Sequence, residues 1–96
     1  MFKKLTLKND FHNTEANFRV QHNGKIEVND IIHLSAGQVK KAKRILCWDD
    51  CTCSAELGTR AEYHEIDGLE VKISEDIKYN NMGELLGASL CIERIW

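Results

Sequence analysis

Proline is absent from this chain of 96 residues, and apolar residues do not form long runs. Without proline, the slow isomerisation of X–Pro bonds plays no part in folding. A membrane-spanning helix needs about 20 predominantly apolar residues, so the sequence excludes such a helix. Residues 1–8 also lack the apolar stretch of a secretory signal. We therefore expect a cytoplasmic protein that has no membrane partner.

Catalytic motifs are missing as well. The sequence has no glycine-rich phosphate loop, and neither a Ser/His/Asp arrangement nor a pair of catalytic carboxylates stands out. Hydrophobic residues make up 43% and charged residues 29% of the chain, which is close to the average of globular proteins. A chain of this length buries enough surface for one modest core. We expect residues 1–96 to form a single domain without enzymatic activity.

Charge is divided unevenly between the two halves of the chain. Residues 1–48 carry nine basic and four acidic side chains, whereas residues 49–96 carry four basic and eleven acidic ones. The formal net charge of −2 conceals this division. Such an asymmetry indicates a charged partner surface. It also fits two halves that face each other in the fold or pair between subunits, in which case no external partner is needed.

The strongest helix signal lies at residues 35–47. Ser35 is a favourable N-cap, and Gln38 three residues later completes a capping box. The apolar residues that follow recur at the spacing of one helix face. They are Val39, Ala42 and Leu46. We predict one capped α-helix from about residue 35 to residue 47.

Alternating apolar and polar residues predict strands in the rest of the chain. Leu5 and Leu7 indicate a first strand. For residues 18–28 we predict a hairpin with a three-residue loop that ends at a left-handed Gly24, because this register places the apolar residues of both strands on one face. Asp67-Gly68 indicates a second hairpin.

The C-terminal region gives weaker signals. Ile77, Met82 and Leu85 have helical spacing and predict a short second helix within residues 75–86. A final strand follows, in which Leu90, Ile92 and Trp96 share one face. Taken together, the patterns predict an α+β domain, in which antiparallel β-hairpins form one sheet beside the capped helix.

Three of the four cysteines lie close together, at Cys47, Cys51 and Cys53. This spacing is compatible with a structural zinc site. The fourth zinc ligand would be His12, with Cys91, His33 and His64 as alternatives. The same thiols also suit a buried core without a metal, and a disulfide or redox pair is the third interpretation. The expected cofactor is therefore none, or one structural zinc ion.

Two charged sets are candidates for partner binding. The acidic set could face a cationic groove of a partner protein. It comprises Glu62, Glu65, Asp67, Glu70, Glu75 and Asp76. The basic set lies on the predicted helix and could contact nucleic-acid phosphates. It comprises Lys40, Lys41, Lys43 and Arg44.

Residues 5–15 and 34–47, running into residues 51–53, resemble small proteins carried by bacteriophages and mobile elements. Small phage proteins without catalytic motifs include inhibitors of host defence, anti-CRISPR proteins among them. The resemblance implies a non-catalytic protein of the host cytoplasm that inhibits a bacterial defence effector by protein–protein contact through the acidic set. The alternative is a small nucleic-acid-binding module that uses the basic set. An enzyme or redox protein built on Cys51 and Cys53 is a further alternative.

Overall fold

The computed structural model describes residues 1–9, 13–46 and 63–96. These residues form six β-strands and one α-helix. In chain order the elements are β1 (Phe2–Asn9), β2 (Thr14–Gln21), β3 (Ile31–Ser35), α1 (Ala36–Leu46), β4 (Tyr63–Ile66), β5 (Leu69–Tyr79) and β6 (Leu85–Ile95).

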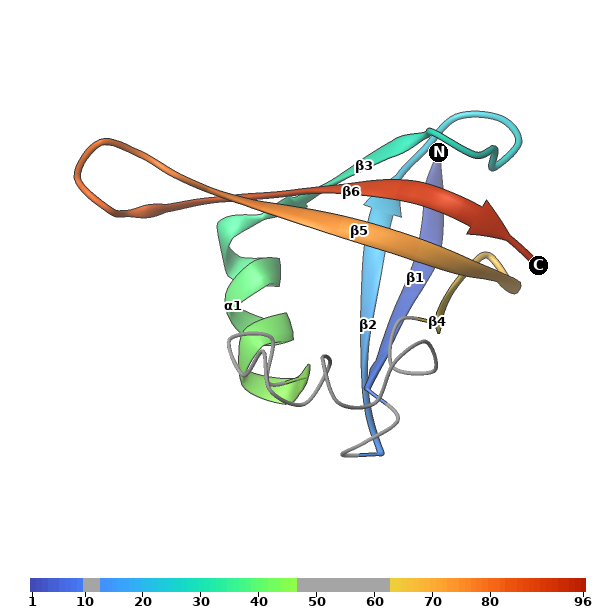
Figure 1. The fold of residues 1–96 in the computed structure, drawn as a ribbon, viewed down its shortest axis with the longest axis horizontal. Helices are drawn as coiled ribbons and strands as arrows, with labels where there is room; N and C mark the ends of the chain where they lie inside the picture. Colours follow the sequence, from blue (N-terminus) through green and yellow to red (C-terminus); the bar gives the residue numbers. More distant parts are fainter. Residues whose placement is uncertain (10–12, 47–62) are drawn as a thin grey trace.

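The strands make one sheet in the order β2-β1-β4-β5-β6-β3, and all neighbours are antiparallel. The sheet curls so strongly that its two edge strands, β2 and β3, come into contact, and α1 packs against both of them (Figure 1). The predicted α+β class with one antiparallel sheet is confirmed. The sheet, however, is closer to a barrel than to a set of separate hairpins.

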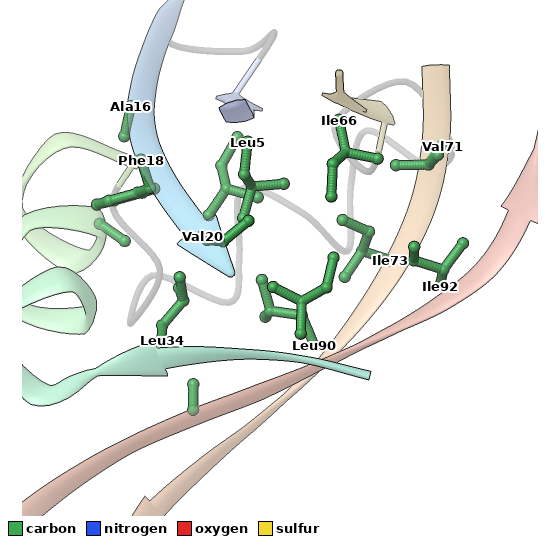
Figure 2. Packing of buried hydrophobic residues seen from close by; sticks show 14 of the residues in the cluster. Leu5, Ala16, Phe18, Val20, Leu34, Ile66, Val71, Ile73, Leu90 and Ile92 are labelled. Carbon is green, nitrogen blue, oxygen red and sulfur yellow. The ribbon is translucent and has the colours of Figure 1, made fainter. Parts of the chain in front are cut away.

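The inner face of the sheet encloses one hydrophobic cluster to which every described strand and the helix contribute (Figure 2). Successive side chains of a strand point to opposite faces. In β2, for example, Ala16, Phe18 and Val20 are buried, whereas Asn17 and Arg19 are exposed. The inner face therefore holds the core, and the outer face carries the polar and charged residues that are available to partners.

Helix α1 begins at the capping box that the sequence predicts. The Ser35 N–H donates a hydrogen bond to Gln38 Oε1 at 2.9 Å, and the Gln38 N–H donates one to Ser35 Oγ at 3.3 Å. The predicted apolar stripe is confirmed as the buried face of the helix. It comprises Val39, Ala42 and Leu46. The predicted last residue, Cys47, lies outside the described residues, and within the described ranges no helix is both long and apolar enough to cross a membrane.

The helix also covers the exposed edge of β2. Every second residue of an edge strand turns its carbonyl group away from the neighbouring strand. Gln38 Nε2 donates to the Arg19 carbonyl at 3.2 Å, and Lys41 Nζ donates to the Asn17 carbonyl at 3.5 Å. Side chains of α1 therefore take the place of a further strand, and they bring the basic side of the helix against β2.

The predicted hairpin at residues 18–28 is wrong. β2 pairs with β1 along eight residues, with Phe18 opposite Leu5, and residues 22–30 contain no strand. Ile26 is buried, as the alternation suggests, but it reaches the core from a loop. Gly24 has the predicted left-handed backbone (φ 80°), but it lies in this loop rather than in a hairpin bulge. The β1–β2 ladder pairs eight residues of each strand, about twice as many as the local hairpin would pair, and the longer ladder prevails.

The hairpin at Asp67-Gly68 is confirmed. β4 and β5 pair so that Ile66 lies opposite Leu69 and Glu65 lies opposite Glu70. The predicted final strand is confirmed as β6, with Leu90 and Ile92 buried on the inner face. Trp96 does not share this face, because the register shifts between Lys72 and Ile73 and places Ile95 against the core instead.

Residues 75–86 do not form the predicted second helix. They form the outer ends of β5 and β6 and the turn between them, and they project beyond the other elements as a long arm (Figure 1). The Asn80 side chain holds the turn, because its Oδ1 accepts the N–H groups of Met82 and Glu84, both at 2.9 Å. Asparagine favours such turns, and a continuous β-ladder is more stable than a short helix of poor helix formers. We call residues 75–86 the β5–β6 arm.

Candidate functional site

The structure brings only part of the acidic set together. Glu62 lies outside the described residues. Glu65 and Glu70 face each other across β4 and β5 on the outer face. Glu65 also accepts a hydrogen bond from Lys8 Nζ at 2.8 Å, and this bond raises the pKa of the Lys8 ammonium. The outer face at this point is therefore a mixed charge cluster rather than a purely acidic one.

The remaining acidic residues point in different directions. Asp67 lies in the exposed turn, 3.4 Å from Lys3 Nζ. Glu75 and Asp76 are neighbours in β5, so their side chains lie on opposite faces of the strand. Asp76 lies 3.7 Å from Lys78 Nζ. The acidic set is thus spread over two faces and a turn, and basic side chains are interleaved with it.

The zinc hypothesis falls mainly on parts of the chain that the structure does not describe. All four residues of the proposed site lie there: Cys47, Cys51, Cys53 and His12. Of the alternatives for the fourth ligand, Cys91 and His33 lie on the outer face and His64 lies on the inner face. Within residues 1–9, 13–46 and 63–96, no group of three or more histidine, cysteine or acidic residues could hold a metal ion.

His64 is a buried titratable group with a strongly lowered pKa. It lies in β4 with only 5% of its surface exposed, and its Nδ1 accepts the backbone N–H of Lys8 at 3.0 Å. Burial and, to a smaller extent, the nearby Lys8 charge together lower the pKa of His64 to about 4. The ring is therefore neutral at pH 7, and its hydrogen bond joins β4 to β1.

The basic set divides into three parts on α1. Lys43 Nζ donates to the Tyr79 hydroxyl at 2.8 Å and lies over the Tyr79 ring, so it holds the β5–β6 arm. Lys41 lies on the other flank, at the edge of β2. Lys40 and Arg44 are exposed on the outward side of the helix. Lys40, Lys41 and Arg44 are therefore open to solvent, and Lys41 adjoins the sheet.

Next to Lys41, the outer face of β1 and β2 is hollowed. An open pocket of about 400 Å³ is lined by Phe2, Lys3, Lys4, Asn17, Phe18 and Arg19. We call it the β1–β2 pocket. Its lining contains no carboxylate. Lys41 adjoins the pocket at the edge of β2, where its Nζ donates to the Asn17 carbonyl at 3.5 Å. The same Nζ lies 5.4 Å from the centre of the Phe18 ring, which belongs to the inner face.

Two cations in the β1–β2 pocket lie directly opposite each other. Lys4 is the cross-strand partner of Arg19, and both are exposed. Like charges in this position repel and destabilise a sheet. The described residues contain no carboxylate that pairs with either of them. The Arg19 guanidinium lies over the exposed Phe2 ring, 4.5 Å from its centre.

Sequence reasoning missed the pocket residues Phe2, Lys4 and Arg19. The signal was present as alternation in residues 2–9 and 14–21, where these residues occupy the polar-face positions of two strands. It could only be recognised once the two segments were known to pair with each other.

Comparison with known proteins gives no further guidance. No family model, no curated protein and no solved structure matches the chain.

Proposed function

We propose that this protein is a non-catalytic module that binds nucleic acid with a basic surface formed by β1, β2 and α1. The observation that carries the proposal is the cross-strand pair Lys4 and Arg19, two exposed like charges without a carboxylate partner among the described residues. Lys41, Lys40 and Arg44 extend this charge along the helix.

Phosphate groups fit this surface for an electrostatic reason. An anion between Lys4 and Arg19 would convert their mutual repulsion into two attractive contacts. Release of the counterions that accompany the phosphates adds to the affinity and makes it dependent on salt. Among the acidic residues of the second half, Asp67 adjoins this surface and pairs with Lys3 at 3.4 Å, so Lys3 is not counted among the phosphate contacts. Screening weakens the effect of exposed charges that lie more than about 10 Å away at moderate salt.

The test is a titration of labelled DNA and RNA with the purified protein by fluorescence anisotropy, at salt concentrations from about 50 to 200 mM. If all five cations contact phosphates, the plot of log K against log salt has a slope of about −3.5 for a single strand. The double variant Lys40→Gln/Arg44→Gln is expected to make the slope shallower by about 1.4.

Lys78→Gln is the matched control for this experiment. Lys78 is an exposed lysine of the β5–β6 arm, and it lies near Asp76. We expect this variant to keep the wild-type affinity and slope. Absence of binding to DNA and RNA at the lowest salt concentration would refute the proposed function.

Contact with a partner protein is a second candidate, and the β5–β6 arm favours it. Tyr79, Met82 and Leu86 are 51%, 83% and 59% exposed on this arm. Protruding apolar side chains of this kind are typical of protein-binding surfaces. In the setting that the phage resemblance implies, the partner is a defence effector in the host cytoplasm, which the protein inhibits.

A cell-based assay separates the two candidates. The protein is expressed in bacteria whose defence nuclease destroys an incoming plasmid, and plasmid survival is measured. If the arm binds the effector, Met82→Asp/Leu86→Asp abolishes protection and Lys40→Gln/Arg44→Gln retains it. If nucleic-acid binding is responsible, the pattern is reversed. Charge reversal at Glu65, Glu70 and Asp76 tests the acidic set in the same assay, and unchanged protection would exclude it.

A further inference from the structure

We infer that the β1–β2 pocket recognises single-stranded nucleic acid, with an unpaired base stacked on Phe2 beside the Arg19 guanidinium and the adjacent phosphates held by Lys4 and Lys41. This inference rests on the proposed function and adds the substrate class to it. It depends on three features that occur at one place on the surface: an exposed ring, an open pocket, and two cations for which residues 1–9, 13–46 and 63–96 supply no carboxylate partner.

The Phe2 ring is available for stacking. It is 58% exposed although the Arg19 guanidinium lies over it, so the cation covers only part of the ring. Proteins bind single strands by stacking bases on aromatic rings, and arginine adds a cation–π contribution. The pocket of about 400 Å³ lies within the usual size range of small-ligand sites. One base can therefore enter beside the ring.

The cations around the ring are placed to hold the backbone of the same strand. Lys4 and Arg19 are cross-strand neighbours on the outer face. Lys41 Nζ is fixed at the β2 edge by the Asn17 carbonyl, at the side of the pocket next to α1. A strand that leaves the pocket over this edge reaches Lys41, and Lys40 and Arg44 are exposed on the same helix. Along the β1–β2 ladder these cations follow Phe2 in one direction, so the surface offers successive phosphate contacts to the part of the strand that leaves the stacked base.

A duplex does not fit this arrangement. The faces of its bases are covered by their stacked neighbours, so Phe2 has no base face to contact. The duplex can use only the phosphate contacts, whereas a single strand uses both the phosphate contacts and the ring. The pocket therefore selects single strands, and this selection depends on Phe2.

A second aromatic–cation pair on the molecule provides a control. Arg94 lies over the Trp96 ring at 4.8 Å from its centre, and the same ring packs edge-on against Tyr63. Trp96 is 44% exposed. This pair lies at the ends of β4 and β6, where Glu93 and Lys72 form an ion pair at 3.7 Å. A carboxylate therefore lies beside the cations at this pair, whereas the lining of the β1–β2 pocket contains none, and we expect the pair to contribute nothing to strand binding.

The experiment compares fluorescein-labelled oligo(dT) and oligo(U) of about 12 nucleotides with a duplex of equal length, by anisotropy at about 50 mM salt. We expect both single strands to bind more tightly than the duplex. Phe2→Ala is expected to weaken single-strand binding by about 5- to 150-fold, the range measured for loss of one stacked base. Phe2→Trp should retain the affinity, and Trp96→Leu should leave it unchanged.

The outcomes distinguish this inference from the function on which it rests. If the duplex binds as tightly as the single strands, or if Phe2→Ala binds like the wild type, base stacking in the pocket is refuted while nucleic-acid binding stands. If Trp96→Leu weakens binding as much as Phe2→Ala, the β1–β2 pocket is not the specific site. If none of the three probes binds, the proposed function itself fails. Because Phe2 is exposed, its variants are expected to fold, and circular dichroism verifies this.

Discussion

His64 is expected to make the folded protein sensitive to mild acid. An unfolded histidine titrates near pH 6.5, whereas burial and the Lys8 charge lower the pKa of His64 to about 4 in the folded state. Between these two values the unfolded chain binds a proton that the folded chain does not bind. The contribution of the neutral His64 ring to the free energy of unfolding is therefore complete above about pH 6.5 and is lost as the pH falls to about 4. The shift corresponds to about 3 kcal/mol, a large part of the stability of a small domain.

The assay is urea denaturation followed by tryptophan fluorescence at several pH values between about 7 and 4.5. His64→Asn is the informative variant, because its side-chain oxygen can accept the Lys8 N–H that Nδ1 of His64 accepts. We expect the wild type to lose about 2–3 kcal/mol over this range and the variant to lose much less. Asp30 does not interfere, since hydrogen bonds from the Glu27 backbone and His22 hold its pKa below its ordinary value. Parallel pH profiles of the two proteins would refute this explanation.

Three further substitutions test the local structure with the same denaturation assay at neutral pH. Ser35→Ala removes the oxygen that accepts the Gln38 N–H, and it is expected to lower stability by about 1 kcal/mol. Gly37→Ala is expected to raise stability by about 0.5–1 kcal/mol, because alanine loses less backbone entropy on folding than glycine and its Cβ atom would have no neighbouring atom within 4 Å. A loss of stability would contradict this expectation. Gly87→Ala places a Cβ atom against the Leu34 carbonyl oxygen, and the φ of 151° at this position is unfavourable for alanine. A loss of stability of about 2–3 kcal/mol is therefore expected. A neutral effect would show that the backbones of β3 and β6 are further apart at this point.

The features that the sequence predicted correctly depend on neighbouring residues. The capping box of α1 needs only Ser35 and Gln38, three residues apart. The turn at Asp67-Gly68 needs only two residues with positive φ. In each case the stabilising hydrogen bonds or backbone angles lie within one short segment, so they are encoded locally.

The features that were predicted wrongly depend on a competition between partners. Residues 25–28 alternate like a strand, but β2 gains a longer ladder by pairing with β1. Residues 75–86 have helical spacing, but the turn at Asn80 allows β5 and β6 to continue their ladder. The sequence of each segment admits both structures, and the difference in buried area and paired backbone decides between them.

The candidate site likewise combines features that the sequence predicts with features that depend on the tertiary structure. The basic side of α1 could be predicted from Lys40, Lys41, Lys43 and Arg44, because helix geometry alone places them outside the apolar stripe. The contribution of Arg19 could not be predicted, since its position beside the helix follows from the contact of α1 with β2. The different role of Lys43 likewise follows from the approach of the arm.

The amino-acid sequence by itself determined the capped helix, the turn at residues 67–68, the apolar positions of the strands and the basic character of the first half. The curled sheet decided the rest: it paired β1 with β2, separated the acidic residues, and placed two like charges and an aromatic ring at one pocket. The physical reason is one of range. Capping and turn formation are governed by bonds between residues a few positions apart, whereas strand pairing is chosen by the total apolar surface that the whole chain can bury.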